Sequence, residues 1–422
     1  MQWQFSRSER WTPEQIAEYQ FRQIRTLVGH AIEHCDFYRG HLAAAGVRHV
    51  HELTAEAYRR WPLLRKREVA ERQAALTAAR YPKEHGPATE TFTTGSTGEP
   101  TRVLHTDVAK FFANLFVIRD HLWHARALDE KLVSIRFTAS EGRQASWSPA
   151  TAAAFRNGPA VVLDVQNDVG TLLDALLREE PSYLLAPPSI LQALLHRSRE
   201  TARVPRRLRE VLTFSEALPP GLRDLVRRVW AVELSDAYSC REAGALALQC
   251  PGTEHYHVQA ENVYVEILRH DGTPCTPGET GRVVITPLHN FAMPLLRYEL
   301  GDFAEPGAPC LCGRGLPVIR RIAGRTRNMA RDPSGRIFQP AFDPVLKHAP
   351  LRQFQVVQHS LQRLELRYVL DRELTAAEAD ALTAALIRQL GYPFEIGLTR
   401  VEEIDRAPGG KYEAFLSRLG DG

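Results

Sequence analysis

The sequence predicts an α/β protein: a large N-terminal α/β layered domain with a β-rich subdomain, followed by a small α+β C-terminal domain. Three observations support this fold class. The chain has 422 residues, more than one compact core usually holds. Short apolar runs alternate with helical patterns in the first half of the chain. A strand-like pattern follows, and the C-terminal part again mixes strands with a helix.

Residues 12–45 are predicted to be helical. Apolar residues from Ile16 to Ile32 recur at the spacing of one helix face. Thr12 and Pro13 make a helix start, because a hydroxyl suits the N-cap position and proline suits the first helical position.

Four brief apolar runs are predicted to be buried strands. They read KLVSIRF (131–137), PAVVLDV (159–165), SYLLAP (182–187) and EVLTF (210–214). The segments between them carry helical patterns, and this alternation is typical of strands covered by helices on both faces of a sheet.

The pattern changes near residue 258. The stretch VYVEILRHDGTPCTPGETGRVVITPL (263–288) alternates like antiparallel strands joined by Asp-Gly and Pro-Gly turns. A β-rich part is therefore expected over residues 245–322. We place the domain boundary at a glycine-bearing stretch, which gives an N-terminal core of residues 1–323 and a mobile C-terminal domain of residues 324–422.

Composition favours an ordinary globular protein without a polyanionic partner. The chain has 53 basic and 50 acidic residues, a net charge of +3, which gives no reason to expect nucleic acid or an anionic membrane. No apolar leader and no long apolar run are found. Six cysteines in such a chain favour reduced thiols and a cytoplasmic location.

The segment TFTTGSTGEPTRVLHT (91–106) is rich in Thr and Ser hydroxyls and contains two glycines, which have no side chain. Glycines let the main chain approach a ligand closely, and successive N–H groups in such a turn suit phosphate oxygens. The segment lacks the GK[ST] ending of a Walker loop. On composition alone, a polar surface hairpin is an equal alternative.

Four further motifs occur in a fixed order after this segment. They read SDAYSCREAG (235–244), PLLRYELGDFAE (294–305), IAGRTRNM (322–329) and APGGKYEAF (407–415). Together, nearly the whole chain resembles the adenylate-forming superfamily of acyl- and aryl-CoA ligases, and it is most similar to the phenylacetate–CoA ligase-like branch.

This resemblance implies that a carboxylic acid and ATP form an acyl-AMP and pyrophosphate, and that the acyl group then passes to CoA. Glu242 would help to hold Mg²⁺, Asp302 would accept hydrogen bonds from the ribose hydroxyls, and Lys411 would bridge the acid and ATP. The catalytic set would be Lys411, Glu242 and Thr94. The phosphate-binding loop would be Thr93, Thr94, Gly95, Ser96, Thr97 and Gly98. The rest of the nucleotide site would be Ser215, Glu216, Ala217, Asp236, Ala237, Tyr238 and Arg325.

The chain departs from the family pattern at three places. Arg241 stands where the superfamily usually has Ser or Thr, Asn328 replaces the hinge aspartate, and ARDPSGRIFQP (330–340) replaces a segment that helps CoA-forming members reach the thiolation conformation. These changes leave the acceptor open between CoA, an amine, a carrier-protein thiol, and nitrite in a diazo-forming variant. A non-catalytic nucleotide-binding relative is a further alternative, and a homodimer is left open.

An aryl or amino-aryl acid is the expected substrate. The segment RFTASEGRQASWSP (136–149) is expected to approach the acyl pocket. Its residues Arg136, Arg143 and Trp147 would favour an aromatic or polar acid, or they lie on the surface.

A metal site is the last hypothesis. Cys250 precedes His255 and His257, and Cys310 and Cys312 form a C-x-C pair. Spacing alone favours buried, reduced cysteines. The resemblance favours a structural Zn²⁺ site formed by Cys250, His257, Cys310 and Cys312, because this branch often carries cysteines there.

Overall fold

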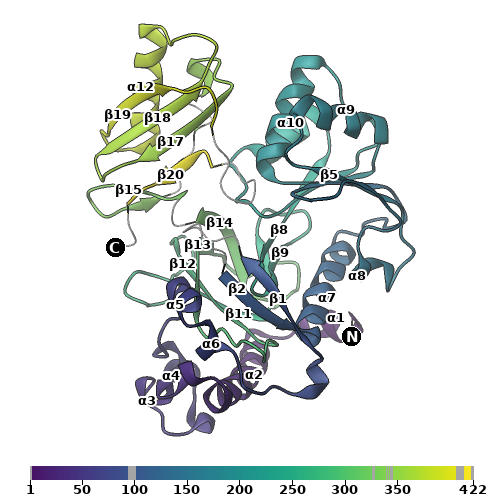
Figure 1. Ribbon diagram of the computed structural model, residues 1–422, viewed down its shortest axis with the longest axis vertical. Helices are drawn as coiled ribbons and strands as arrows, with labels where there is room; N and C mark the ends of the chain where they lie inside the picture. Colours follow the sequence, from purple (N-terminus) through teal and green to yellow (C-terminus); the bar gives the residue numbers. More distant parts are fainter. Residues whose placement is uncertain are drawn as a thin grey trace. The chain divides into compact units, whose positions relative to one another are not determined.

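The computed structural model describes residues 2–93, 101–325, 328–338, 340, 342, 346–404 and 413–419. These residues form two compact units, both of mixed α/β structure (Figure 1). The first unit comprises residues 1–131, 144–160 and 235–322, and the second comprises residues 132–143, 161–234 and 323–422. In the described part of the chain, no helix has both the length and the apolar character needed to cross a bilayer.

The predicted N-terminal helix is present as α2 (Pro13–His34). The Thr12 hydroxyl accepts a hydrogen bond from the Gln15 N–H, and the Gln15 side chain accepts one from the Thr12 N–H. This capping box satisfies two N–H groups that a helix start leaves without partners. The helix buries Ile24 and Leu27 completely.

Other helical segments of the first unit are short, except α7. They are α1 (Gln2–Ser8), η1 (Asp36–Tyr38), α3 (His41–Ala44), η2 (Val50–Glu52), α4 (Ala55–Arg59), α5 (Lys66–Glu71), α6 (Gln73–Leu76), η3 (Lys83–His85), α7 (Asp107–Trp123) and α8 (Pro149–Ala152).

The strands of the first unit confirm the β-rich prediction. In spatial order they are β11 (Val263–Leu268), β12 (Gly281–Pro287), β13 (Tyr298–Pro306), β14 (Val318–Arg325), β10 (Tyr256–Val258), β9 (Gly244–Gln249) and β8 (Glu233–Cys240). The pairings β11–β12, β12–β13, β10–β14, β9–β10 and β8–β9 are antiparallel. A separate hairpin of β1 (Ala88–Thr93) and β2 (Thr101–Thr106) flanks the predicted phosphate loop.

The four predicted apolar strands are all present in the second unit. The strand order there is β7 (Glu210–Thr213), β6 (Tyr183–Ala186), β3 (Leu132–Arg136), β5 (Ala160–Asp164) and β4 (Gly142–Gln144). The pairs β3–β6 and β6–β7 are parallel, as expected for buried strands joined through helices. The helices are α9 (Val169–Glu179), α10 (Pro188–Thr201) and α11 (Leu222–Trp230), and α10 packs against both others. Figure 1 shows α9 and α10 side by side.

The C-terminal part is a small α+β domain with its own core. A four-stranded sheet has the order β19 (Glu395–Arg400), β18 (Arg363–Val369), β17 (Gln353–Gln358) and β20 (Phe415–Ser417). The predicted helix is α12 (Ala376–Leu390) (Figure 1). Its Leu382 and Leu386 pack in one apolar cluster with Val356 and Leu366 of the sheet. The smaller elements are β15 (Ala330–Arg331), β16 (Ile337–Phe338) and η5 (Leu346–His348).

Candidate active site

Part of the predicted site lies outside the described residues. This holds for Lys411 and, in the predicted phosphate loop, for Thr94, Gly95, Ser96, Thr97 and Gly98. What the structure does describe is the hairpin on either side of that loop. Its last pair is Thr93 opposite Thr101, and the preceding pair is Phe92 opposite Arg102.

The Glu242 carboxylate is buried in the first unit, between strands β8 and β9. Its side chain accepts a hydrogen bond of 3.2 Å from the phenol of Tyr298, which begins β13. Glu242 is 6% exposed and Tyr298 is 1% exposed. The turn that holds Glu242 ends at Gly244, which has φ +73°, and a Cβ there would lie 2.7 Å from the Ala113 Cβ. Glycine is therefore required at this position.

The side chains predicted to bind adenine and ribose are joined directly. The Tyr238 hydroxyl on β8 donates a 2.8 Å hydrogen bond to the Asp302 carboxylate on β13. Both side chains are buried. Burial raises the pKa of Tyr298 well above its ordinary value, and the neighbouring Glu242 and Asp302 carboxylates add to this effect. The Glu242 and Asp302 carboxylates therefore both lie close enough to the buried Tyr298 phenol to raise its pKa.

Cys240 belongs to the same surroundings. Burial raises the pKa of its thiol well above the ordinary value, with further contributions from Glu242 and Asp302. The thiol is therefore protonated at neutral pH.

Asp236 and Ala237 lie on β8 beside Tyr238. The Asp236 carboxylate is buried and accepts a 2.6 Å hydrogen bond from the Tyr256 hydroxyl. Its backbone N–H donates to the Gln249 side chain. This network fixes the strand that carries Tyr238.

Four residues predicted to contact the nucleotide belong to the second unit: three come after strand β7, and one is the last residue of β14. Ser215 has φ +67°, a left-handed conformation that is uncommon for a residue other than glycine. The Glu216 carboxylate accepts hydrogen bonds from the N–H and the hydroxyl of Ser189, in the first turn of α10. Ala217 follows Glu216, and Arg325 is the last residue of β14.

The residues proposed to contact the acid are largely engaged elsewhere. The Trp147 indole N–H donates a 2.8 Å hydrogen bond to the Glu130 carbonyl, and Trp147 is buried. Arg143 forms hydrogen bonds of 2.8 and 2.9 Å to the Glu179 carboxylate. Arg136, in contrast, is exposed at the end of β3.

The structure brings all four predicted zinc ligands together in the first unit. The Cys250 and Cys310 sulfurs are 3.9 Å apart, and the Cys312 sulfur lies 3.3 Å from the Nε2 atom of His257. Two sulfurs bound at about 2.3 Å to one tetrahedral ion lie about 3.8 Å apart, so the observed spacing suits zinc.

One further candidate ligand was missed by the sequence prediction. The ligand atoms of Cys250, His255, His257 and Cys310 all lie within 4.8 Å of one another. His255 joins this group because the Cys250 N–H bonds the His255 carbonyl across a tight turn. A structural zinc ion takes four ligands, so these five side chains are candidates for four coordination positions.

His257 has the tautomer that a zinc ligand needs. Its Nδ1 atom lies 3.3 Å from the Leu316 carbonyl oxygen, which can only accept a hydrogen bond. Nδ1 therefore carries the proton, and Nε2 presents its lone pair to the thiols. Burial lowers the pKa of His257 to about 4, so the ring is neutral at neutral pH.

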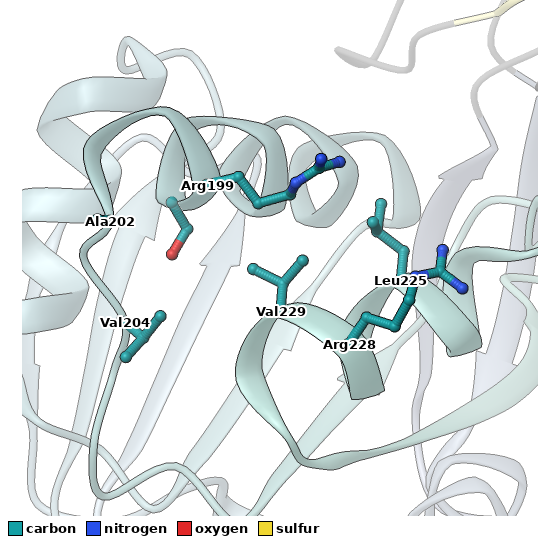
Figure 2. A pocket seen from close by; sticks show the side chains of 7 residues that line it. Arg199, Ala202, Val204, Leu225, Arg228 and Val229 are labelled. Atoms are coloured by element: carbon teal, nitrogen blue, oxygen red, sulfur yellow. The ribbon is translucent and has the colours of Figure 1, made fainter. Parts of the chain in front are cut away.

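One hollow lies away from every predicted residue. It has a volume of about 350 Å³ and lies between α10 and α11 in the second unit (Figure 2). Its walls include Arg199, Arg228 and Val229. Because none of the predicted site residues line it, this hollow is not the candidate active site.

Comparison with known proteins identifies the family. The AMP-binding enzyme family matches residues 26–292, and the CapK C-terminal domain matches residues 333–418. The phenylacetate-coenzyme A ligase of Escherichia coli (strain K12) is 25% identical over 328 residues, which cover 75% of this chain and 72% of that ligase. The Thermus thermophilus ligase of the same name is 27% identical over 207 residues, which cover 47% of this chain and 44% of that ligase.

Solved structures share the fold. A 2-hydroxyisobutyryl-CoA ligase in the postadenylation state has a TM-score of 0.77 and 19% identity, with 98% of this chain and 91% of that chain covered. An anthranilate CoA ligase in complex with anthranoyl-AMP has a TM-score of 0.58 and 15% identity, with 78% and 66% covered. The family match includes the loop segment and the buried Glu242. The chain therefore belongs to the AMP-binding enzyme family, as a phenylacetate–CoA ligase-like, adenylate-forming member.

Proposed function

We propose that this protein activates an aryl or amino-aryl carboxylic acid with ATP as an acyl-AMP and then transfers the acyl group to CoA. The observation that carries the proposal is the pair of buried carboxylates, Glu242 and Asp302. Each is held by a tyrosine hydroxyl, and both raise the pKa of Tyr298. Buried carboxylates are rarely kept without a cation or a hydrogen-bonding ligand to match them.

Each carboxylate has a separate task in this proposal. Glu242 would hold Mg²⁺, which prefers carboxylate and phosphate oxygens and would neutralise phosphate charge. Tyr298 donates to one Glu242 oxygen and so leaves carboxylate acceptor capacity for the ion. Asp302 would accept hydrogen bonds from the two ribose hydroxyls, with Tyr238 beside the adenine.

The remaining assignments follow the family resemblance. Lys411 would bridge the acid and the α-phosphate, and the C-terminal domain, with its boundary after residue 323, would move to bring it in. The phosphates would bind at Thr93, Thr94, Gly95, Ser96, Thr97 and Gly98. The nucleotide would also be contacted by Ser215, Glu216, Ala217, Asp236, Ala237 and Arg325.

Acid-dependent exchange of pyrophosphate into ATP tests the first half-reaction. We expect exchange with at least one acid in a panel of aryl and amino-aryl acids, and its loss in Lys411→Ala. CoA-dependent release of AMP from the same acid tests the second half-reaction. If the panel stays silent while ATP still binds, the non-catalytic alternative is favoured.

A second candidate function changes only the acceptor. The Asn328 amide, at the position of the usual hinge aspartate, donates a 2.8 Å hydrogen bond to the Phe415 carbonyl. An aspartate has no proton to donate there, so this contact is specific to asparagine. An altered hinge favours an acceptor other than CoA, namely an amine, a carrier-protein thiol or nitrite.

Comparing AMP release with CoA, amines and nitrite separates the two candidates. Asn328→Asp adds a sharper test, because it removes the bond to Phe415 and restores the family residue. If the acceptor is CoA, wild type already releases AMP with CoA. If the hinge excludes CoA, only Asn328→Asp does so.

We also propose that Cys250, His257, Cys310 and Cys312 hold a structural Zn²⁺, with His255 as a competing fourth ligand. The spacing of these atoms and the tautomer of His257 support this assignment. Such a site would fix the β9–β10 turn to the β13–β14 connection, since these two segments supply the ligands.

A further inference from the structure

Arg241 is adjacent in sequence to the buried Glu242, and its side chain contacts the end of β1 in the β1–β2 hairpin. It immediately precedes Glu242 in the β8–β9 turn. Its Nη1 atom donates a 2.7 Å hydrogen bond to the Phe92 carbonyl oxygen. Phe92 is the penultimate residue of β1, so the guanidinium lies where the chain leaves the hairpin toward residues 94–100.

The Arg241 guanidinium has no carboxylate partner among the residues that the structure describes. The other arginine of this region, Arg102, differs: its Nη1 lies 2.6 Å from the Glu90 carboxylate, and its Nε bonds Gln73. The Arg241 side chain is exposed, and only one of its five N–H donors is engaged by Phe92.

The backbone that carries Arg241 is held in place. The Arg241 backbone lies next to the ring of the buried His105 on β2. Three residues further on, the close approach of Ala113 confines the chain at Gly244. The bond from the Arg241 side chain to Phe92 and the contact of the His105 ring with the Arg241 backbone thus join the β1–β2 hairpin to the β8–β9 turn.

The neighbouring sequence explains why a cation is needed at this point. Residues 91–101 read TFTTGSTGEPT and contain no lysine or arginine. The hydroxyls and N–H groups of such a segment can donate to phosphate oxygens, but they bring no charge to a polyanion. Guanidinium groups bind phosphate through paired N–H donors and keep their charge at all working pH values.

We propose that Arg241 binds the β- and γ-phosphate oxygens of ATP and stabilises the departing pyrophosphate. This inference rests on the proposed adenylation. In that step the acid's carboxylate oxygen forms a bond to the α-phosphorus, and the bond from that phosphorus to the bridging oxygen of the β-phosphate breaks. The electron pair leaves with pyrophosphate, and the Arg241 guanidinium stabilises the negative charge that this group gains.

The replacement of the usual Ser or Thr by Arg241 then has a chemical meaning. A hydroxyl donates one hydrogen bond, whereas a guanidinium adds a positive charge. Its attraction to the leaving group increases as that group gains negative charge. Arg241 therefore supplies a cation that the glycine-rich segment lacks.

Equilibrium binding of Mg²⁺–ATP, inorganic pyrophosphate and AMP to the full-length protein tests this proposal without knowledge of the acid. Arg241→Gln retains an N–H donor for Phe92 but loses the charge. We expect it to weaken ATP and pyrophosphate binding about 10- to 100-fold and AMP binding by less than about threefold. Arg241→Lys should recover part of the loss. Arg102→Gln, a matched change on the β1–β2 hairpin, should leave all three affinities unchanged.

Two results would overturn the assignment: wild-type affinity for ATP in Arg241→Gln, or an equal loss for AMP and ATP with a lower melting temperature, which would make Arg241 a structural anchor. Failure of the proposed function gives a different result. There, the binding pattern holds, but no acid supports pyrophosphate exchange. If the wild-type protein binds no ATP at all, both proposals fall.

Discussion

The Tyr298 hydroxyl and the Glu242 carboxylate are bonded at 3.2 Å in the interior of the first unit. This hydrogen bond orients the Glu242 carboxylate before any ligand binds. The carboxylate can then bind a cation without rearranging, and such preorganisation is typical of efficient sites.

Tyr298→Phe should weaken the response of the enzyme to magnesium. Loss of the hydroxyl removes the donor that orients Glu242 and costs about 1–3 kcal/mol of stability, because a buried carboxylate loses a partner. We expect the Mg²⁺ concentration for half-maximal pyrophosphate exchange to rise several-fold.

Tyr58→Phe is the matched control for this change. Tyr58 is also fully buried, and its hydroxyl bonds the neutral Thr286 hydroxyl at 2.8 Å. Both variants should lose stability, but only Tyr298→Phe should alter the magnesium dependence. An equal magnesium response in the two variants would remove Tyr298 from the site.

Tyr238→Phe should weaken ATP binding through the ribose. Tyr238 donates a 2.8 Å hydrogen bond to Asp302, so its loss leaves that carboxylate less well positioned for a vicinal diol. We expect the Kd for ATP to rise about tenfold, in keeping with one hydrogen bond to a charged group. The Kd for 2′,3′-dideoxy-ATP should stay the same, and an equal rise for both nucleotides would argue against ribose recognition by Asp302.

The cysteine cluster should hold about one equivalent of zinc after gentle purification, as measured by elemental analysis. Cys310→Ser should reduce the zinc content below about half an equivalent and lower the melting temperature, because metal binding contributes to folding. Cys275→Ser, at a thiol outside the cluster, is the control and should keep its zinc. Comparing Cys312→Ser with His255→Gln identifies the fourth ligand, since only the true ligand's removal releases the metal.

The C-terminal domain should lose stability in acid through Glu365. Partial burial acts to raise the pKa of this carboxyl, but hydrogen bonds from His359, Thr399 and Arg367 outweigh burial and lower the pKa to about 2. A pKa that is lower in the folded state stabilises the fold above the unfolded value of 4.5. This contribution disappears as the pH falls from there to about 2.

The free energy of unfolding, measured against pH for wild type and Glu365→Gln, checks this expectation. The variant should be less stable by about 1–2 kcal/mol at pH 7, and the difference should vanish toward pH 2. A constant difference across this range would show that Glu365 acts by packing and not by charge.

Local pattern was sufficient for much of the fold. The capping box at Thr12, the four apolar strands and the helix at residues 376–390 all follow from periodicity and short-range hydrogen bonding, which depend on neighbours in sequence. The order of motifs also identified the family, because each motif carries its chemistry in a few adjacent residues.

The sequence by itself therefore determined the fold class, the family, and Glu242 and Asp302 as candidate ligands. Only the tertiary structure decided that Tyr298 and Tyr238 hold those carboxylates, that Arg241 reaches Phe92, and that His255 joins the cysteines. It also showed Trp147 and Arg143 engaged with Glu130 and Glu179. The physical reason is that these contacts join residues far apart in the chain, and their geometry is set by how strands pair and pack, which no local pattern encodes.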